Sequence, residues 1–137
     1  MFYRVVLDTN VLISAIFSKQ SPPFQCLMLA RLGDIESVTC QEILTEFAEK
    51  LLHKFKFSQE MTQEAVGAVQ QISRLVTISG QLKFVSQDAD DDMVVECAVL
   101  GKATHIVTGD KDLLRLECYQ GIEIVKPGHF ISLLRVV

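Results

Sequence analysis

Short runs of β-branched and other apolar residues alternate along the chain with longer stretches in which apolar residues recur every three or four positions. The first pattern is typical of buried strands, and the second is typical of helices that pack one face against a core. We predict strands over residues 5–7, 35–39, 75–78, 104–108 and 122–125. A first helix is predicted to begin near residue 11. Six further helices are predicted over residues 21–32, 39–55, 58–72, 90–100, 110–116 and 127–134.

The alternation of strands and helices predicts an α/β fold in which a parallel sheet is covered by helices on both faces. No linker, repeat or low-complexity segment interrupts the sequence, so we expect residues 1–137 to form a single domain. In such a sheet, ligands bind at the carboxyl ends of the strands. Functional side chains are therefore expected just after the predicted strands.

Two aspartates occupy such positions, because Asp8 directly follows the first predicted strand and Asp110 lies two residues past the fourth. If these strands are neighbours where the strand order reverses, both carboxylates enter one crevice and form a metal-site geometry. The alternative is structural, since aspartates at such turns cap helices and complement the helix dipole. Thr9 and Asn10 have the same capping alternative.

Two segments, Val6–Leu12 and Ile106–Leu114, resemble the signature motifs of the PIN-domain family. Between them, Ile43–Phe47 and Asp91–Ala98 resemble the segments that carry the family's second and third acidic residues. The resemblance covers nearly the whole chain and is closest to VapC-like toxins of bacterial toxin–antitoxin systems. It implies a three-layer α/β/α sandwich with strand order 3-2-1-4-5 and an endoribonuclease that uses Mg²⁺ or Mn²⁺.

The resemblance implies that four acidic residues are catalytic and bind one or two metal ions: Asp8, Glu46, Asp92 and Asp110. Glu46 is chosen over Glu42 because Thr39–Glu42 has the spacing of a capping box, which accounts for Glu42. Asp92 is chosen because its spacing from Asp110 resembles that of the family. Its neighbours Asp90 and Asp91 are interpreted as first-turn residues that complement the helix dipole.

Carboxylates suit Mg²⁺ or Mn²⁺, because hard cations prefer oxygen ligands and keep several bound waters. Such an ion lowers the pKa of a bound water and polarises the scissile phosphate. Asn10 and Thr108 are expected to support the ligands by hydrogen bonding, and Asp112 is a candidate outer acid. The histidines are spread over separate segments and are interpreted as structural or surface residues.

The net charge of −4 and the pI of about 5.3 argue at first against nucleic acid as a partner. Two divalent ions in the crevice would remove this objection, because they bring positive charge to the place where phosphate must bind. Five basic residues are candidates for contacts with the RNA backbone: Lys50, Lys54, Lys56, Lys111 and Arg115. Their alternative role is a solvated surface.

The N-terminal residues do not predict export, because Asp8 interrupts the first apolar run before the hydrophobic core of a signal peptide can form. No stretch reaches the roughly 18 consecutive apolar residues that a spanning helix needs. The four cysteines lack metal-site spacing and are predicted to be reduced thiols, with a disulfide framework as the alternative. We therefore expect a cytoplasmic protein that is not inserted in a membrane.

The resemblance also implies a homodimer and an antitoxin partner, for which Phe17, Phe24 and Met28 are candidate contacts unless they belong to the core. A catalytically silent PIN-like module that binds RNA or protein is the alternative function. A haloacid-dehalogenase phosphatase fits poorly, since Asn10 stands where it needs a second aspartate. A receiver domain fits poorly as well, because Ser79 and Gly80 follow the third strand instead of a phosphoacceptor.

Overall fold

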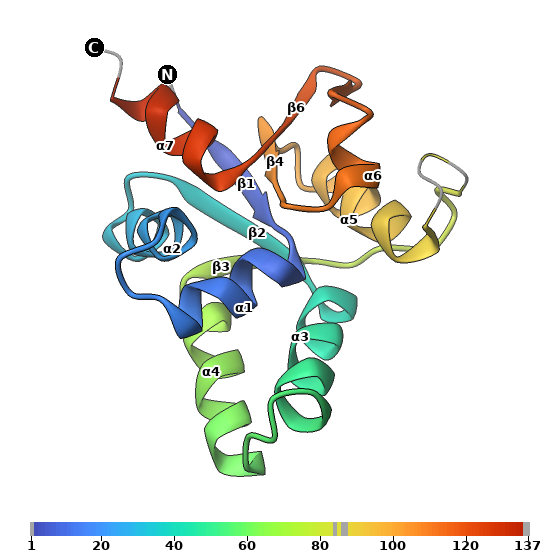
Figure 1. The fold of residues 1–137 in the computed structure, drawn as a ribbon. Helices are drawn as coiled ribbons and strands as arrows, with labels where there is room; N and C mark the ends of the chain where they lie inside the picture. The colour runs from blue at the N-terminus through green and yellow to red at the C-terminus, as the bar shows by residue number, and fades with distance from the viewer. Residues whose placement is uncertain (1, 84, 86–87, 136–137) are drawn as a thin grey trace.

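The computed structural model describes residues 2–83, 85 and 88–135. Strands and helices alternate through most of the chain, as Figure 1 shows. The strands are β1 (Arg4–Leu7), β2 (Glu36–Cys40), β3 (Ser73–Val76), β4 (His105–Val107), β5 (Cys118–Tyr119) and β6 (Ile122–Val125). The helices are α1 (Thr9–Phe17), α2 (Pro22–Leu32), α3 (Gln41–His53), α4 (Gln59–Gln71), α5 (Ala89–Leu100), α6 (Lys111–Leu114) and α7 (Pro127–Leu134).

Within the described residues, six strands form one sheet in the order β3-β2-β1-β4-β6-β5. Neighbouring strands from β3 to β6 run parallel, and only β5 is antiparallel to its neighbour β6. The predicted parallel sheet is confirmed, with β6 as the predicted fifth strand. The sequence pattern missed β5 because Cys118–Tyr119 is too short to show a period of two.

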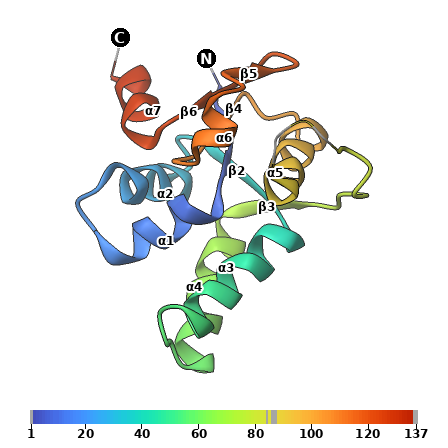
Figure 2. The ribbon, with the colours of Figure 1, turned by 45° about the vertical axis from the view of Figure 1, so that its right-hand side comes forward.

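Helices cover both faces of the sheet, which confirms the predicted three layers. Figure 2 shows α5 on one side and α1, α2 and α7 on the other. The helices α3 and α4 pack against each other and extend beyond the sheet. Central strand residues such as Val6, Val38 and Ile106 are fully buried, each contributing about 1.5–3 kcal/mol by leaving water. Burial on both faces explains why these strands read as continuous apolar runs.

The predicted capping box at the start of α3 is wrong. The N-cap residue is Cys40, which makes no side-chain capping bond. Thr39 instead belongs to β2 and pairs with Leu75 of β3. Its buried hydroxyl has no hydrogen-bond partner among the described residues. Strand pairing therefore decides the conformation of Thr39, and Glu42 is not explained by a cap.

The helices of the described residues include none that is both long and apolar enough to cross a membrane. Cys26, Cys40 and Cys97 are buried and Cys118 is exposed, all as free thiols. Buried free cysteines behave as small apolar residues, so these side chains contribute mainly to packing.

Candidate metal centre

The carboxyl ends of β1 and β4 lie side by side where the strand order reverses. Leu7 pairs with Val107 across the two strands, and the backbone N–H of Asp8 donates to the Val107 carbonyl at 3.0 Å. The next residues on both strands therefore emerge at one edge of the sheet. Asp8 and the Thr108–Asp110 turn meet there, as expected for neighbouring parallel strands.

Asp8 is the N-cap of α1, and its side chain is 6% exposed. Its carboxylate accepts hydrogen bonds from the Thr9 N–H at 2.8 Å and the Asn10 amide at 3.2 Å. The Thr108 hydroxyl donates a third bond at 2.7 Å. Burial raises the pKa of Asp8 above its ordinary value, although the bonds from Thr108 and Thr9 oppose the shift. The neighbouring Glu46 and Asp110 charges raise the pKa further.

Thr108 and Asn10 join the two strand ends through polar side chains. The fully buried Thr108 hydroxyl accepts the backbone N–H of Asp110 at 3.0 Å while it donates to Asp8. The Asn10 side-chain oxygen accepts the Gly109 N–H at 3.2 Å, and its amide donates to Asp8. Both residues thus restrict the position of the Asp8 carboxylate and of the turn that carries Asp110.

A cluster of three more carboxylates adjoins this turn. Asp88, Asp91 and Asp110 each offer one oxygen, and these oxygens all lie within 4.8 Å of one another. Asp88 is the N-cap of α5 and Asp110 is the N-cap of α6. Burial raises the pKa of Asp91 to about 8, and Asp110, Asp8 and Asp88 raise it by hydrogen bonding or charge. Such crowding favours a bound proton or cation.

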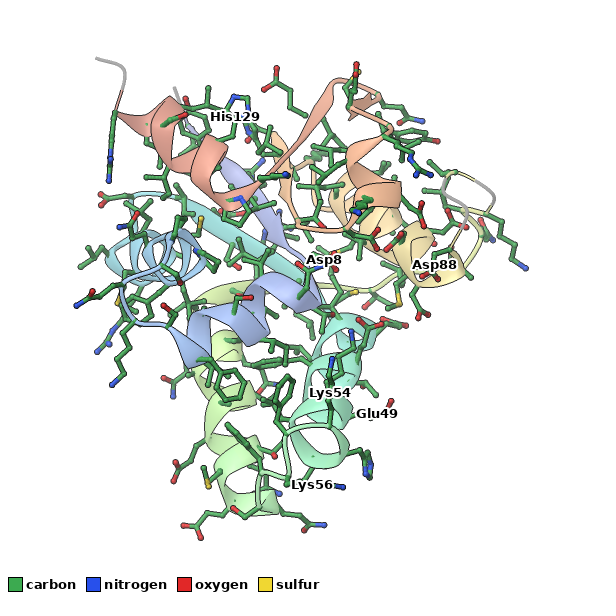
Figure 3. The ribbon with its side chains drawn as sticks, in the orientation of Figure 1. Asp8, Glu49, Lys54, Lys56, Asp88 and His129 are labelled. Carbon is green, nitrogen blue, oxygen red and sulfur yellow. The ribbon has the colours of Figure 1, made fainter. Side chains whose placement is uncertain are left out.

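These carboxylates line one end of an open cavity of about 800 Å³. Figure 3 shows Asp8 near the centre of the molecule, Asp88 to its right, Glu49 on α3, and Lys54, the C-cap residue of α3, below Asp8. The acidic residues at one end are Asp8, Glu42, Glu46, Asp88, Asp90, Asp91 and Asp110, so Glu42 and Glu46 of α3 both line the cavity. The wall formed by α3 continues toward its C-terminus with Glu49, Lys50, His53 and Lys54. The cavity therefore runs from an acidic end to a basic end.

Asp8, Glu46 and Asp110 of the predicted acidic set line this cavity, whereas Asp92 does not. Asp92 instead accepts the backbone N–H of Val85 at 3.0 Å. Consecutive helical residues point about 100° apart, so adjacent side chains face different ways. The neighbouring Asp91, which is 4% exposed, occupies the cavity. The structure thus differs from the expectation that Asp91 only complements the helix dipole.

Among the supporting candidates, Asn10 lines the cavity, and Thr108 reaches it through Asp8. Asp112 accepts a hydrogen bond from Arg115 at 3.2 Å outside the cavity. Of the predicted basic residues, Lys50 and Lys54 belong to the cavity wall. Lys50 also forms an ion pair with Glu46 at 3.6 Å. The other three basic candidates do not line the cavity: Lys56, Lys111 and Arg115.

Glu96 is a buried acid that sequence reasoning missed. Its carboxylate accepts the N–H groups of Ser79 at 2.7 Å and Gly80 at 3.2 Å, and the Ser79 hydroxyl at 2.9 Å. Burial alone would raise the pKa of Glu96, but the bonds from Ser79, Leu82 and Gly80 outweigh it and lower that pKa. Glu96 therefore fastens the segment after β3 to α5. The sequence signal that could have identified Glu96 is its position on the same helix as the acidic run Asp90–Asp92.

The family model described as PIN domain matches residues 4–112. The chain belongs to the PIN-domain family. The match includes β1, β4 and every acidic residue that lines the cavity of this PIN domain. It confirms the family resemblance carried by the two end motifs.

Similar proteins include a sequence relative and a solved structure. This PIN domain is 34% identical over 118 residues to an uncharacterized protein of Methanocaldococcus jannaschii, covering 82% of this chain and 74% of the relative. A similar solved structure is the crystal structure of VapBC2 from Rickettsia felis bound to a DNA fragment from their promoter. That match has a TM-score of 0.62 and 16% identity, and covers 88% of this chain and 96% of the other. At this identity the likeness supports the fold.

Proposed function

We propose that this PIN domain is a metal-dependent endoribonuclease that hydrolyses RNA phosphodiester bonds. The observation that carries the proposal is the gathering of Asp8, Asp91 and Asp110 at one end of an open cavity. Together with Asp88, these residues provide four crowded carboxylates, which form an all-oxygen donor set. Oxygen donors fit Mg²⁺ or Mn²⁺ better than a soft metal, because histidine and thiolate ligands are absent from the cluster that the described residues form.

Asp88, Asp91 and Asp110 would hold the first ion, and Asp8 would face it from the end of β1. A bound Mg²⁺ or Mn²⁺ supplies charge that polarises the phosphate and lowers the pKa of a bound water. The raised pKa of Asp91, about 8, supports this assignment, since a cation relieves the crowding that otherwise retains a proton. The proposal accommodates one ion or two.

Glu46 contributes from the opposite wall of the cavity. Its carboxylate either completes a second ion site or accepts a proton from the attacking water, and Lys50 lies 3.6 Å from its Oε1 atom. Thr108 and Asn10 orient Asp8, so that its carboxylate does not rotate away from the cluster. The protein thus supplies fixed ligands and a positioned acceptor for the proton.

Replacing Thr108 with valine tests this orienting role. Valine keeps the shape of threonine but removes the hydroxyl that bonds both Asp8 and the Asp110 N–H. We expect Mn²⁺ affinity to fall by about 10- to 100-fold, as for other residues that orient ligands. Calorimetric Mn²⁺ titration measures the effect. Thr108→Ser keeps the hydroxyl and should stay near wild type; equal losses in both variants would assign Thr108 to packing alone.

We also propose a cytoplasmic toxin that forms a homodimer and pairs with a small antitoxin. The support is analogy with the VapBC2 structure and the family resemblance. Of the candidate contact residues, Phe17 is exposed, while Phe24 and Met28 are half-buried. These side chains are therefore not fully buried in the core, which leaves them accessible to a partner. Light scattering across a range of concentrations checks the dimer.

Cleavage of labelled single-stranded RNA tests the proposed activity. Wild-type protein should cut RNA in Mn²⁺, EDTA should stop cleavage reversibly, and Zn²⁺ should substitute poorly. Asp8→Asn should abolish cleavage while circular dichroism stays native, because asparagine still caps α1. Glu64→Gln removes a charge from the exposed face of α4 and should keep full activity. Cleavage that survives in Asp8→Asn, or an inactive wild type that still binds RNA, contradicts the proposal.

A further inference from the structure

Charge is distributed unevenly along this acidic chain. All 17 aspartates and glutamates lie outside two stretches, residues 9–33 and 50–59. These stretches contain only basic charged residues: Lys19, Arg31, Lys50, Lys54 and Lys56. The helices α1 and α3, which end within these stretches, contact each other in the fold. Residues 50–59, which include no acidic residue, therefore supply Lys50, His53 and Lys54 to the basic end of the cavity.

Three phenylalanines gather in this region, and we call Phe17, Phe55 and Phe57 the aromatic patch. The ring centroids of Phe17 and Phe55 lie 4.8 Å apart, and those of Phe17 and Phe57 lie 5.9 Å apart. Phe17 ends α1 and is 54% exposed, although it is among the largest apolar side chains. Aromatic pairs at such centroid distances attract each other, so the exposed Phe17 ring packs against the other two rings.

Lysines connect the aromatic patch with the cavity. The Lys54 ammonium lies 5.5 Å from the centroid of the Phe55 ring, and Lys54 also lines the basic end of the cavity. Lys56 lies between two rings of the patch in sequence, and its side chain is exposed. Lys54 is the C-cap residue of α3, and Figure 3 shows Lys56 at the far end of the α3–α4 pair from Asp8. Basic residues thus continue from the cavity to the aromatic patch.

We propose that the aromatic patch, together with Lys54 and Lys56, binds unpaired bases and phosphates of single-stranded RNA beside the cleavage site. The inference rests on the proposed function, which places the scissile phosphate at the acidic end of the cavity. Aromatic rings stack on any base whose face is free, and neighbouring lysines neutralise the backbone. Bases in a duplex hide these faces, so the patch selects single strands and loops.

Charge favours RNA over a protein partner for this surface. A polyanion suits residues 50–59 around the patch, which bring Lys50, Lys54 and Lys56 and no carboxylate. Lys54 both lines the cavity and contacts the Phe55 ring. An RNA chain bound in the cavity can therefore extend past Lys54 onto the patch. A second copy of the chain or an antitoxin on the same surface is a competing outcome of the test.

The absence of tryptophan from the sequence allows a direct test by fluorescence. Phe17→Trp places the only indole in the patch, and Asp8→Asn in the same protein prevents cleavage. The matched control is Phe2→Trp, because Phe2 is 56% exposed and also lies beside a cation, Arg4, at 5.3 Å. Single-stranded RNA should quench the indole at position 17 saturably, whereas duplex RNA should not. The indole at position 2 should not respond to either RNA.

Kinetics provide a second measurement that does not depend on the tryptophan. In otherwise wild-type protein, Phe17→Ala should raise KM for long single-stranded RNA about tenfold and leave kcat unchanged. A trinucleotide too short to reach the patch should be cut equally well by both proteins. Arg31→Ala, on α2 outside the patch, serves as the charge control and should leave KM unchanged.

The outcomes separate this inference from the proposed function. RNA cleavage without quenching at position 17 overturns the inference and leaves the ribonuclease intact. Saturable quenching without metal-dependent cleavage supports the patch but overturns the ribonuclease. Equal quenching at positions 2 and 17 overturns the inference as well. A fluorescence change that follows protein concentration or added antitoxin, with no response to RNA, assigns the patch to protein contacts and also overturns it.

Discussion

Asp91→Asn is expected to abolish RNA cleavage in Mn²⁺, while Asp92→Asn leaves cleavage within a fewfold of wild type. Asp91 lines the cavity beside Asp110, so its replacement removes a charged ligand of the proposed ion. Asp92 lies outside the cavity and accepts the Val85 N–H, a bond that the asparagine oxygen retains. Single-turnover rates at saturating Mn²⁺ measure both effects, with a loss of about a thousandfold or more for Asp91.

The two substitutions are a matched pair, because they remove the same charge from adjacent residues of α5. A general loss of stability or of negative charge would affect both variants alike. The opposite pattern, with Asp92→Asn inactive and Asp91→Asn active, would restore the assignment made from the spacing to Asp110.

Asp110→Asn should raise the melting temperature of the metal-free protein, although it removes a proposed ligand. The substitution takes one charge out of a crowded cluster and keeps the cap of α6, since asparagine also accepts the Asp112 N–H. A gain of about 1 kcal/mol corresponds to a few degrees. Mn²⁺ at about 100 times its Kd should stabilise the wild type by about 2.7 kcal/mol and the variant by less. Thermal unfolding of both proteins, with and without Mn²⁺, measures this.

The difference between the metal-free proteins should depend on pH. The pKa of Asp91 is raised in the folded protein, to about 8, from 3.8. A raised folded pKa contributes stability that is present below pH 4 and is lost as pH rises through 8. Asp110 is one cause of that shift, so its replacement should matter little at pH 5 and most above pH 8. A lower melting temperature for Asp110→Asn at every pH would make Asp110 a structural residue.

The sequence pattern predicted the layers and the parallel strands because both depend on burial. Val5–Leu7 and Ile106–Val107 are covered on both faces and therefore read as apolar runs. Local rules failed where tertiary contacts decide the conformation. Thr39 has the chemistry of a cap, but its pairing with β3 keeps it in a strand. The short β5 leaves no pattern because two residues cannot show an alternation.

The candidate site was predictable to the extent that strand ends determine it. Asp8 and Asp110 follow neighbouring strands, so topology alone brings them together. The sequence could not show that Asp91 and not Asp92 faces the cavity, because α5 is buried on nearly every side and its apolar residues define no single face. Glu46 was placed by the family resemblance, since helical periodicity did not turn it toward the cavity.

The two parts of the site, at the ends of the paired strands β1 and β4, are synthesised at different times. Asp8 is synthesised 100 residues before Thr108, which bonds its carboxylate. Until β4 has been synthesised and docked beside β1, the nascent chain contains Asp8 without Asp110. Pairing over such a sequence separation is a late and slow step of folding. The proposed ribonuclease therefore gains activity only after β4 has paired with β1, so a nascent chain that lacks β4 is inactive.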